Sequence, residues 1–328
     1  MNRADWPYWL REHRGTLLAL AAFLLMFTIY ATNHPAGLNA NVANTAANKG
    51  VLLAIVAMAQ TLVVLTSGID LSVGMVMVLC NCLASTIVIG SPLQVALGVV
   101  GVLATGILCG AVNALIVIYG RLQPIVATIA TGAVFYGAAL ALRRVPGGDF
   151  DPTIGDALTG KIGNWLPASL VLLLALVLLI WVPFGRSLTG RSVYAVGSAE
   201  VAAFMSGVPV RRAKFAAYAL SGLMASIAGI FITCITSSGE ASAANGNTYT
   251  LYSIAAVVLG GVSLFGGSGS AIGAIFGALM FRTIGDLLFV FDLDPLWQPL
   301  FQGVVLASAV SLGAWRLLRV RNRLDLYG

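Results

Sequence analysis

Apolar runs of about twenty residues recur along the whole sequence, and only short polar segments separate them. A helix needs about 20 apolar residues to cross the roughly 30 Å of hydrocarbon in a bilayer. Of the 328 residues, 59% are hydrophobic and only 9% are charged, which leaves too little polar surface for a water-soluble domain. The sequence therefore predicts an all-α integral membrane protein whose single transmembrane domain covers residues 1–328.

The basic residues predict how the chain is oriented. We expect about ten transmembrane helices, near 16–32, 49–66, 71–90, 92–119, 124–142, 168–184, 214–236, 250–265, 270–290 and 296–315. Cytoplasmic loops of membrane proteins carry an excess of Lys and Arg, and placing both N and C termini in the cytoplasm puts 13 of the 18 there. These 13 are Arg3, Arg11, Arg14, Arg121, Arg186, Arg191, Arg211, Arg212, Lys214, Arg316, Arg319, Arg321 and Arg323. Because they are scattered over loops, the net charge of +6 indicates orientation, with no nucleic acid partner. A secretory signal over the first span is the alternative, although its apolar run is longer than the usual 7 to about 15 residues.

A polar, glycine-flanked segment separates the second and third spans at Gly68–Gly74, which reads GIDLSVG. A carboxylate at membrane depth costs roughly 3 kcal/mol, so it usually faces a protein interior or a wet cavity. The segment and nearby polar side chains therefore predict a pathway or gate formed by Gln60, Ser67, Gly68, Asp70, Ser72, Asn81 and Asn113. The alternative is that Asp70 only caps the following helix, while the amides bond to neighbouring helices.

A second stretch of interest is the basic loop 185–213, which we expect to be cytoplasmic. Within it, Ser198–Met205 predicts a short helix with Ser198 as its N-cap. A helix of two turns is marginal alone, so its apolar face would need a partner surface; the alternative is that it rests on lipid headgroups. The candidate contact segment comprises Gly197, Ser198, Glu200, Val201, Ala202, Phe204, Met205, Ser206 and Gly207.

A third, glycine-rich stretch covers Ile254–Leu279. Its glycines predict helix breaks and close helix packing, and they are Gly260, Gly261, Gly266, Gly267, Gly273 and Gly277. Its GSGS sequence lacks the lysine and following Ser or Thr of a phosphate-binding loop, so the chain does not hydrolyse ATP by that route. Leu65, Gly68 and Gly74 align with Leu264, Gly267 and Gly273 at a constant offset of 199, which indicates two similar helix breaks.

Arg282 and Asp286 stand four residues apart in the ninth predicted span. Residues at this spacing share a helix face, so we expect them to form an intramembrane ion pair. The pair would be either structural or part of a subunit interface or pathway. No His, Cys or carboxylate cluster suggests a metal site or a catalytic centre, so the sequence predicts neither a cofactor nor an enzyme.

Together the three stretches resemble the permease subunits of ATP-binding-cassette importers of the ribose, xylose and galactose class. GIDLSVG at Gly68–Gly74 fits the family pattern, and so does IAAVVLGG followed by SL, GG and spaced glycines over Ile254–Leu279. The loop matches at Tyr194, Ala195, Gly197, Glu200, Ala202, Ser206 and Gly207. The resemblance covers most of the chain.

The resemblance implies a transport subunit of the bacterial inner membrane. A second permease copy, identical or related, would complete the pathway, a cytoplasmic ATPase would power it, and a periplasmic sugar-binding protein would deliver a monosaccharide. The segment around 197–208 would be the coupling helix. Ala199 and Phe204 depart from the family pattern, as does Thr250-Leu251-Tyr252 where an acidic Glu-Leu-Asp is usual. Another small solute, such as a branched-chain amino acid or nucleoside, or an independent secondary transporter, is the alternative.

Overall fold

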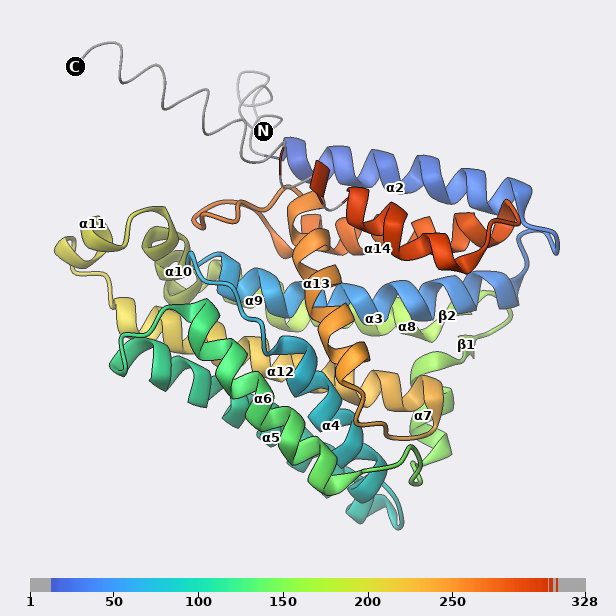
Figure 1. Ribbon diagram of the computed structural model, residues 1–328, viewed down its shortest axis with the longest axis horizontal. Helices are drawn as coiled ribbons and strands as arrows, with labels where there is room; N and C mark the ends of the chain where they lie inside the picture. Colours follow the sequence, from blue (N-terminus) through green and yellow to red (C-terminus); the bar gives the residue numbers. More distant parts are fainter. Residues whose placement is uncertain (1–12, 306, 309–310, 312–328) are drawn as a thin grey trace.

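The computed structural model describes residues 13–305, 307–308 and 311, which form a bundle of helices with one small hairpin (Figure 1). In chain order the elements are α2 (Arg14–Asn33), α3 (Ala40–Val64), α4 (Val73–Ile87), α5 (Pro92–Tyr119), α6 (Pro124–Leu142), α7 (Pro152–Thr159), β1 (Lys161–Ile162), β2 (Leu166–Pro167), α8 (Ala168–Leu176), α9 (Val182–Arg186), α10 (Leu188–Ser198), α11 (Glu200–Met205), α12 (Val210–Thr236), α13 (Ala243–Leu259) and α14 (Ala271–Val290). A π-helical segment, η1 (Val177–Trp181), joins α8 to α9, and a 3-10 turn, η2 (Pro295–Trp297), precedes a helix over 298–305.

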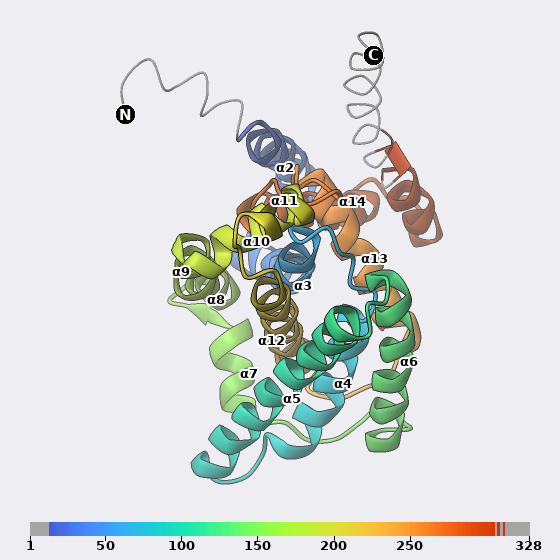
Figure 2. The same cartoon turned by 90° about the vertical axis from the view of Figure 1, so that its left-hand side faces the viewer.

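The long helices extend between two ends of the bundle. Helices α10 and α11 lie at one end, and α7 lies at the other with the β1–β2 hairpin (Figure 1). We call these the α11 end and the α7 end. Figure 2 looks onto the α11 end, with several of the long helices seen nearly along their axes.

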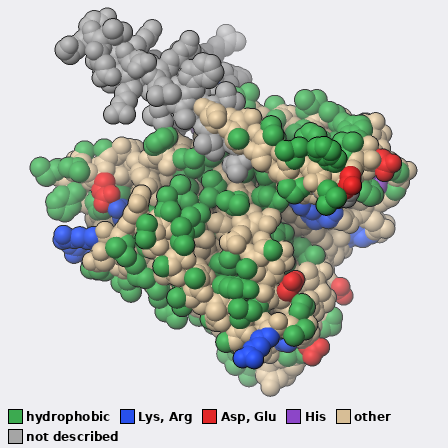
Figure 3. Space-filling view, viewed as in Figure 1, with side chains coloured by type: hydrophobic (Ala, Val, Ile, Leu, Met, Phe, Trp, Pro, Cys, Tyr) green, Lys and Arg blue, Asp and Glu red, His purple; other side chains and the backbone are tan. Residues whose placement is uncertain are grey.

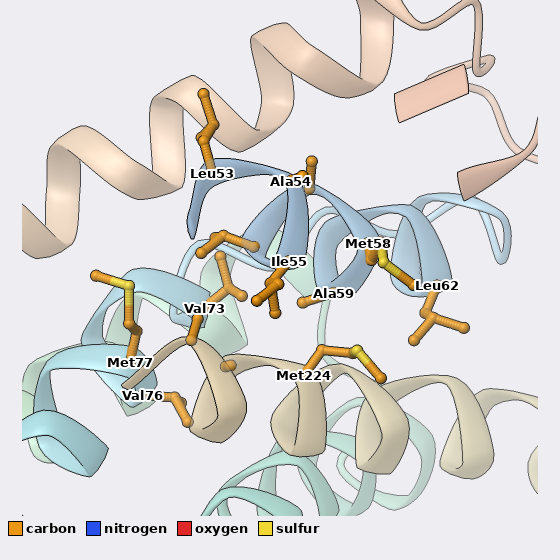
Figure 4. Close-up of a cluster of buried hydrophobic side chains, with 14 of the residues drawn as sticks. Leu53, Ala54, Ile55, Met58, Ala59, Leu62, Val73, Val76, Met77 and Met224 are labelled. Carbon is orange, nitrogen blue, oxygen red and sulfur yellow. The ribbon is translucent and has the colours of Figure 1, made fainter. Parts of the chain in front are cut away.

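Helix α3 forms the axis of the bundle. Every residue from Val51 to Val64 is buried, and a helix that is apolar on all sides is stable only when other elements surround it. Helices α12, α13, α14 and α8 all pack against it. Figure 4 shows Ile55 and Leu62 of α3 in one cluster with Val73 of α4 and Met224 of α12.

Among the described residues, seven helical stretches are long and apolar enough to cross a membrane. They are α2, α3, α5, α6, the continuous stretch Ala168–Arg186, α12 and α14. Large apolar side chains remain exposed on the outer helices, as at Leu25, Leu97, Val134 and Leu179, and hydrophobic atoms cover much of the face seen in Figure 3. This pattern suits a lipid solvent and confirms the coarser prediction of a mostly helical membrane protein, to which the structure adds the short β1–β2 hairpin.

The predicted helix boundaries differ from the observed ones where polar residues belong to a helix. The predicted spans 92–119 and 124–142 coincide with α5 and α6. The predicted start at residue 49 is wrong, because α3 begins at Ala40, where the Asn39 side chain accepts hydrogen bonds from two backbone N–H groups. Asn44 and Asn48 lie within α3 and donate to the carbonyl oxygen of Thr159, at 2.9 and 2.8 Å.

The end of the chain is described only in part. The predicted tenth span, 296–315, extends beyond the described residues, and both chain termini lie outside them. The basic residues predicted to be cytoplasmic at Arg3, Arg11 and 316–323 lie outside them as well.

Glycines bring the backbones of α13 and α14 into direct contact. A Cβ atom added at Gly273 would lie 2.2 Å from the carbonyl oxygen of Gly260, and one at Gly277 would lie 2.1 Å from that of Ala256. The turn after α13 also meets α2, since a Cβ atom at Gly261 would lie 2.4 Å from the Cα of Gly15. Only glycine fits these crossings without moving a helix.

Replacing Gly277 with alanine should lower the thermal unfolding midpoint of the purified protein. The new methyl group would overlap the carbonyl oxygen of Ala256, and overpacking of this kind typically costs about 1–3 kcal/mol. The matched control is Gly137→Ala in α6, where an added Cβ has no neighbour within 4 Å. Equal midpoints for the two variants in one detergent would contradict this account of the crossing.

Candidate functional site

The chain leaves the helical conformation between α3 and α4, over residues 65–72. Ser67 has a left-handed backbone with a φ of 64°, which ends the turn that follows α3. Residues 68–72 then lead, without helical structure, to the start of α4. Gly68 lies close to α12 on this path, because a Cβ atom there would be 3.1 Å from the hydroxyl oxygen of Tyr218.

The three stretches singled out in the sequence meet at the α11 end of this break. The hydroxyl oxygen of Ser67 lies 2.9 Å from the carbonyl oxygen of Gly197 and 2.7 Å from that of Phe265, so it donates to this pair of acceptors. The backbone N–H of Gly267 donates to the carbonyl oxygen of Leu65 at 3.1 Å. We call this meeting point the junction, and it consists of residues 65–67, 197–198 and 265–267.

Glycine is required at the junction because the backbones touch. A Cβ atom at Gly197 would lie 1.9 Å from the carbonyl oxygen of Leu65 and 2.5 Å from the backbone nitrogen of Gly267. Gly266 and Gly267 have φ values of 84° and 69°, a conformation that glycine adopts without steric cost. The sequence alignment of the two helix breaks thus corresponds to two breaks in direct contact.

Asp70 lies inside the bundle and is only 3% exposed. Its Oδ1 accepts hydrogen bonds from the backbone N–H of Ser72 at 2.8 Å and from the Ser72 hydroxyl at 2.6 Å. The side-chain amide of Gln60 of α3 faces the backbone of Asp70; in the orientation that satisfies both groups, it donates to the carbonyl oxygen of Asp70 at 2.9 Å and accepts from its N–H at 3.2 Å. The carboxylate therefore fixes the turn that precedes α4, although it does not cap the helix, because Ser72 is the N-cap residue of α4 and no side chain of the described residues caps that end.

A hydrogen-bond chain extends from this turn to α5 and α6. Asn113 donates to the Ser72 hydroxyl oxygen at 2.8 Å, and Thr131 donates to the amide oxygen of Asn113 at 2.6 Å. Thr128 accepts from the N–H of Leu71, and Thr250 of α13 accepts from that of Gly74. These threonines gave no signal in the sequence, because an apolar span also accommodates a Thr that bonds only its own preceding turn.

Asn81 does not belong to this group of residues. Its amide nitrogen donates to the Thr233 hydroxyl oxygen at 2.8 Å and to the carbonyl oxygen of Ser238 at 3.0 Å, and its oxygen accepts from the N–H of Glu240. It ties α4 to the end of α12 and to the chain that follows. Gln60, Asp70, Ser72 and Asn113 therefore come together, whereas Ser67 lies at the junction and Asn81 lies elsewhere. Their roles in transport stay predictions.

The predicted short helix is present but starts later than expected. It is α11, with Ala199 as N-cap residue, and Ser198 is not its cap but the last residue of α10, where its hydroxyl donates to the carbonyl oxygen of Tyr194. Ser198 continues α10 because this local bond competes with capping. Glu200 is held by Lys214 of α12, whose ammonium lies 2.7 Å from both carboxylate oxygens.

The apolar face of α11 has no partner within the described part of the chain. Phe204 and Met205 are 70% and 80% exposed, and Val201 is exposed as well. Beside them, a groove of about 960 Å³ runs between α11, the start of α12 and the turn joining α5 to α6, with Arg121 and Arg212 among its lining residues. An exposed apolar anchor beside basic side chains is typical of a protein-binding surface.

The predicted ion pair between Arg282 and Asp286 is not formed within the described part of the chain. Asp286 instead lies 3.6 Å from the ammonium of Lys49, on α3. Lys49 is the first residue of the second predicted span, but α3 starts nine residues before it, so Lys49 lies on α3 opposite Asp286 with its side chain 43% exposed. Asp286 thus pairs with Lys49 on the facing helix α3 and not with Arg282 on its own helix.

The chain has membrane-length helices, two interrupted segments in contact, and an exposed helix joined to both. These features define it as a multi-pass transport permease, which is a transport subunit rather than an enzyme. The profile of the family described as the permease component of branched-chain amino acid transport systems matches residues 42–310. The chain belongs to this family of permeases, which function in the bacterial inner membrane.

Curated relatives extend over most of the chain. It is 34% identical over 306 residues to the ribose import permease protein RbsC of Escherichia coli strain K12, which covers 92% of this chain and 93% of that protein. It is 33% identical over 304 residues to a probable ABC transporter permease protein of Sinorhizobium fredii, with 92% and 89% covered. It is 36% identical over 277 residues to the fructose import permease protein FrcC of Rhizobium meliloti, with 80% and 75% covered. No solved structure matches the chain.

The two interpretations of Asp70 predict different results for two substitutions. Asp70→Ala removes both acceptor bonds to Ser72 and should lower stability by about 1–3 kcal/mol, whereas Asp70→Asn keeps an acceptor oxygen and should be nearly neutral in thermal unfolding. If asparagine were as damaging as alanine to transport while folding normally, the negative charge itself would be needed, and the turn that Asp70 forms with Ser72 would not by itself explain the residue.

Proposed function

We propose that the chain is the membrane-spanning subunit of an ATP-driven, binding-protein-dependent importer of a monosaccharide. It would form the translocation pathway with a second permease subunit, identical or related. The observation that supports this most directly is the junction, since it joins the loop that carries α11 to both interrupted segments. Relatives named for ribose and fructose import favour a sugar as the solute.

In the proposed orientation the chain crosses the membrane ten times. The α11 end and both termini lie in the cytoplasm. Loops and helix ends there carry Arg14, Arg121, Arg186, Arg191, Arg211, Arg212 and Lys214. The α7 end carries Arg143, Arg144 and Lys161. This asymmetry has the sense that the positive-inside rule requires.

A cytoplasmic ATPase is the proposed partner of α11. A groove on the ATPase would cover the exposed apolar face of α11. A helix of six residues needs such a contact in order to be stable. The ion pair between Glu200 and Lys214 would pass a displacement of α11 to α12. The junction would pass it to the ends of α3 and α13, and so to the interior turn at Asp70.

A periplasmic sugar-binding protein is the proposed partner of the α7 end. Asp151 caps α7, and its hydrogen bond from Thr153 holds the pKa of the carboxyl below its usual range, so the group stays charged at neutral pH. Exposed Arg144 and Asp156 lie on the same connection. Charges of this kind set association rate and orientation more than affinity.

Reconstitution tests the function as a whole. The purified chain in liposomes, supplied with its ATPase and binding protein, should accumulate a labelled pentose or hexose only when ATP is present. Accumulation of a branched-chain amino acid or a nucleoside would replace the sugar as substrate. Flux without any ATPase would identify a secondary transporter and contradict the proposal.

Placing a charge on the apolar face of α11 should uncouple the importer. Phe204→Asp or Met205→Asp would remove an interface anchor, and such anchors contribute about 2 kcal/mol or more, which corresponds to about 30-fold weaker ATPase binding. ATPase co-purification and ATP-driven uptake measure the effect. Leu188→Asp is the matched control, because Leu188 is 81% exposed at the same end but belongs to α10. Normal uptake by both α11 variants would contradict the coupling role.

A methyl group at the junction should impair ATP-driven uptake without preventing the ATPase from binding. Gly197→Ala would place Cβ on the carbonyl oxygen of Leu65, so uptake should fall while the ATPase stays bound through α11. Gly185→Ala is the control, since an added Cβ there has no neighbour within 4 Å. Unchanged uptake by a folded Gly197→Ala protein would show that the junction transmits nothing.

A further inference from the structure

A polar pocket of about 410 Å³ lies near the α7 end, between α2, α3, α14 and residue 298, and it lies apart from the junction and the α11 groove. Tyr30 and His34 line it from the end of α2, Lys49 from α3, and Arg282 and Asp286 from α14. Figure 3 shows basic side chains in a recess on this side of the bundle. The proposed transport function uses none of these groups.

The cations of this pocket have unused hydrogen-bonding capacity. Lys49 and Asp286 are 3.6 Å apart, which is an ion pair without a hydrogen bond. The Nε of Arg282 is shielded from solvent and has no hydrogen-bond partner in the described part of the chain. A guanidinium carries five N–H donors, and leaving a shielded one unmet at membrane depth is costly, while the three donors of the half-exposed Lys49 ammonium are free to meet a ligand.

The charges of the pocket indicate the sign of its ligand. Lys49 and Arg282 contribute two positive charges and Asp286 one negative charge, which leaves one positive charge unbalanced. A single anionic group would complete the balance. The planar fork of an arginine matches phosphate and carboxylate oxygens in a bidentate manner, and an ammonium adds a third contact.

The position of the pocket favours a phosphate group. Tyr30 is in the last turn of α2, and its ring and that of Phe289 line the pocket, where aromatic side chains typically meet lipid headgroups. Lys49 lies nine residues into α3, about 13 Å from the start of that helix. Leu25 on the adjoining part of α2 is exposed, as expected of a surface against lipid tails.

We propose that this pocket binds one phosphate group, through Arg282 and Lys49, with Asp286 limiting its affinity. The group is either the phosphodiester of an anionic phospholipid or a free phosphate in solution. This site is independent of the proposed solute pathway, so its failure would leave the transport function untouched.

The test measures binding to the full-length chain purified in a neutral detergent. Native mass spectrometry titrations with phosphatidylglycerol, with diacylglycerol and with inorganic phosphate compare the two phosphate sources with a phosphate-free lipid. We expect one phosphatidylglycerol per chain and no specific diacylglycerol. Displacement of that lipid by millimolar phosphate would identify free phosphate as a second source for the site, and its absence would identify the lipid alone.

Three variants assign the site. Arg282→Gln should weaken phosphatidylglycerol binding at least about tenfold, because it removes charge-assisted hydrogen bonds. Asp286→Asn should strengthen it, an opposite sign that a folding defect would not produce. Arg144→Gln removes an exposed charge at the same end outside the pocket and should leave binding unchanged. Wild-type binding by Arg282→Gln, or no binding of either phosphate source by the native chain, would overturn the proposal.

Discussion

Hydrogen bonds at the junction hold together two places where the chain is not helical and the last turn of α10. Inside a bilayer a free backbone group has no water to bond, so a helix can end there only where another group supplies a partner. The hydroxyl of Ser67 serves the carbonyl groups of Gly197 and Phe265, and the N–H of Gly267 serves that of Leu65. The two breaks therefore stabilise each other, and the hydroxyl of Ser67 also holds the end of α10, next to α11.

Polar side chains within the bundle also find partners on neighbouring segments. Asp70 finds donors on Ser72, and Asn113 and Thr131 continue the chain of bonds to α6. Lys49 and Asp286 offset each other's charge across two helices. The Nε of Arg282 departs from this pattern, as do the buried hydroxyl groups of Tyr218 and Ser221, and Arg282 alone of these three carries a charge.

Local sequence patterns predicted the elements whose signals are local. The bounds of α5 and α6 agree with the sequence because Pro92 and Pro124 mark their first residues. The start of α3 could not be predicted from the local sequence. Its polar residue Asn48 is accommodated in the helix by a hydrogen bond to a carbonyl group 111 residues away, which no local pattern shows. The predicted ion pair between Asp286 and Arg282 was wrong for the same reason. Helix periodicity shows which residues share a face, but it does not show that α3 lies opposite α14. The three functional stretches were each recognised, but only the fold shows that they touch.

The enclosure of α3 on every side has a consequence for the route of the solute. A bundle built around a packed helix has no lumen along its axis, since Val51–Val64 fill that space with side chains. A hydrated molecule the size of a sugar would have to travel along the outside of such a bundle. This packing agrees with the proposal that a second permease subunit supplies the facing wall of the passage.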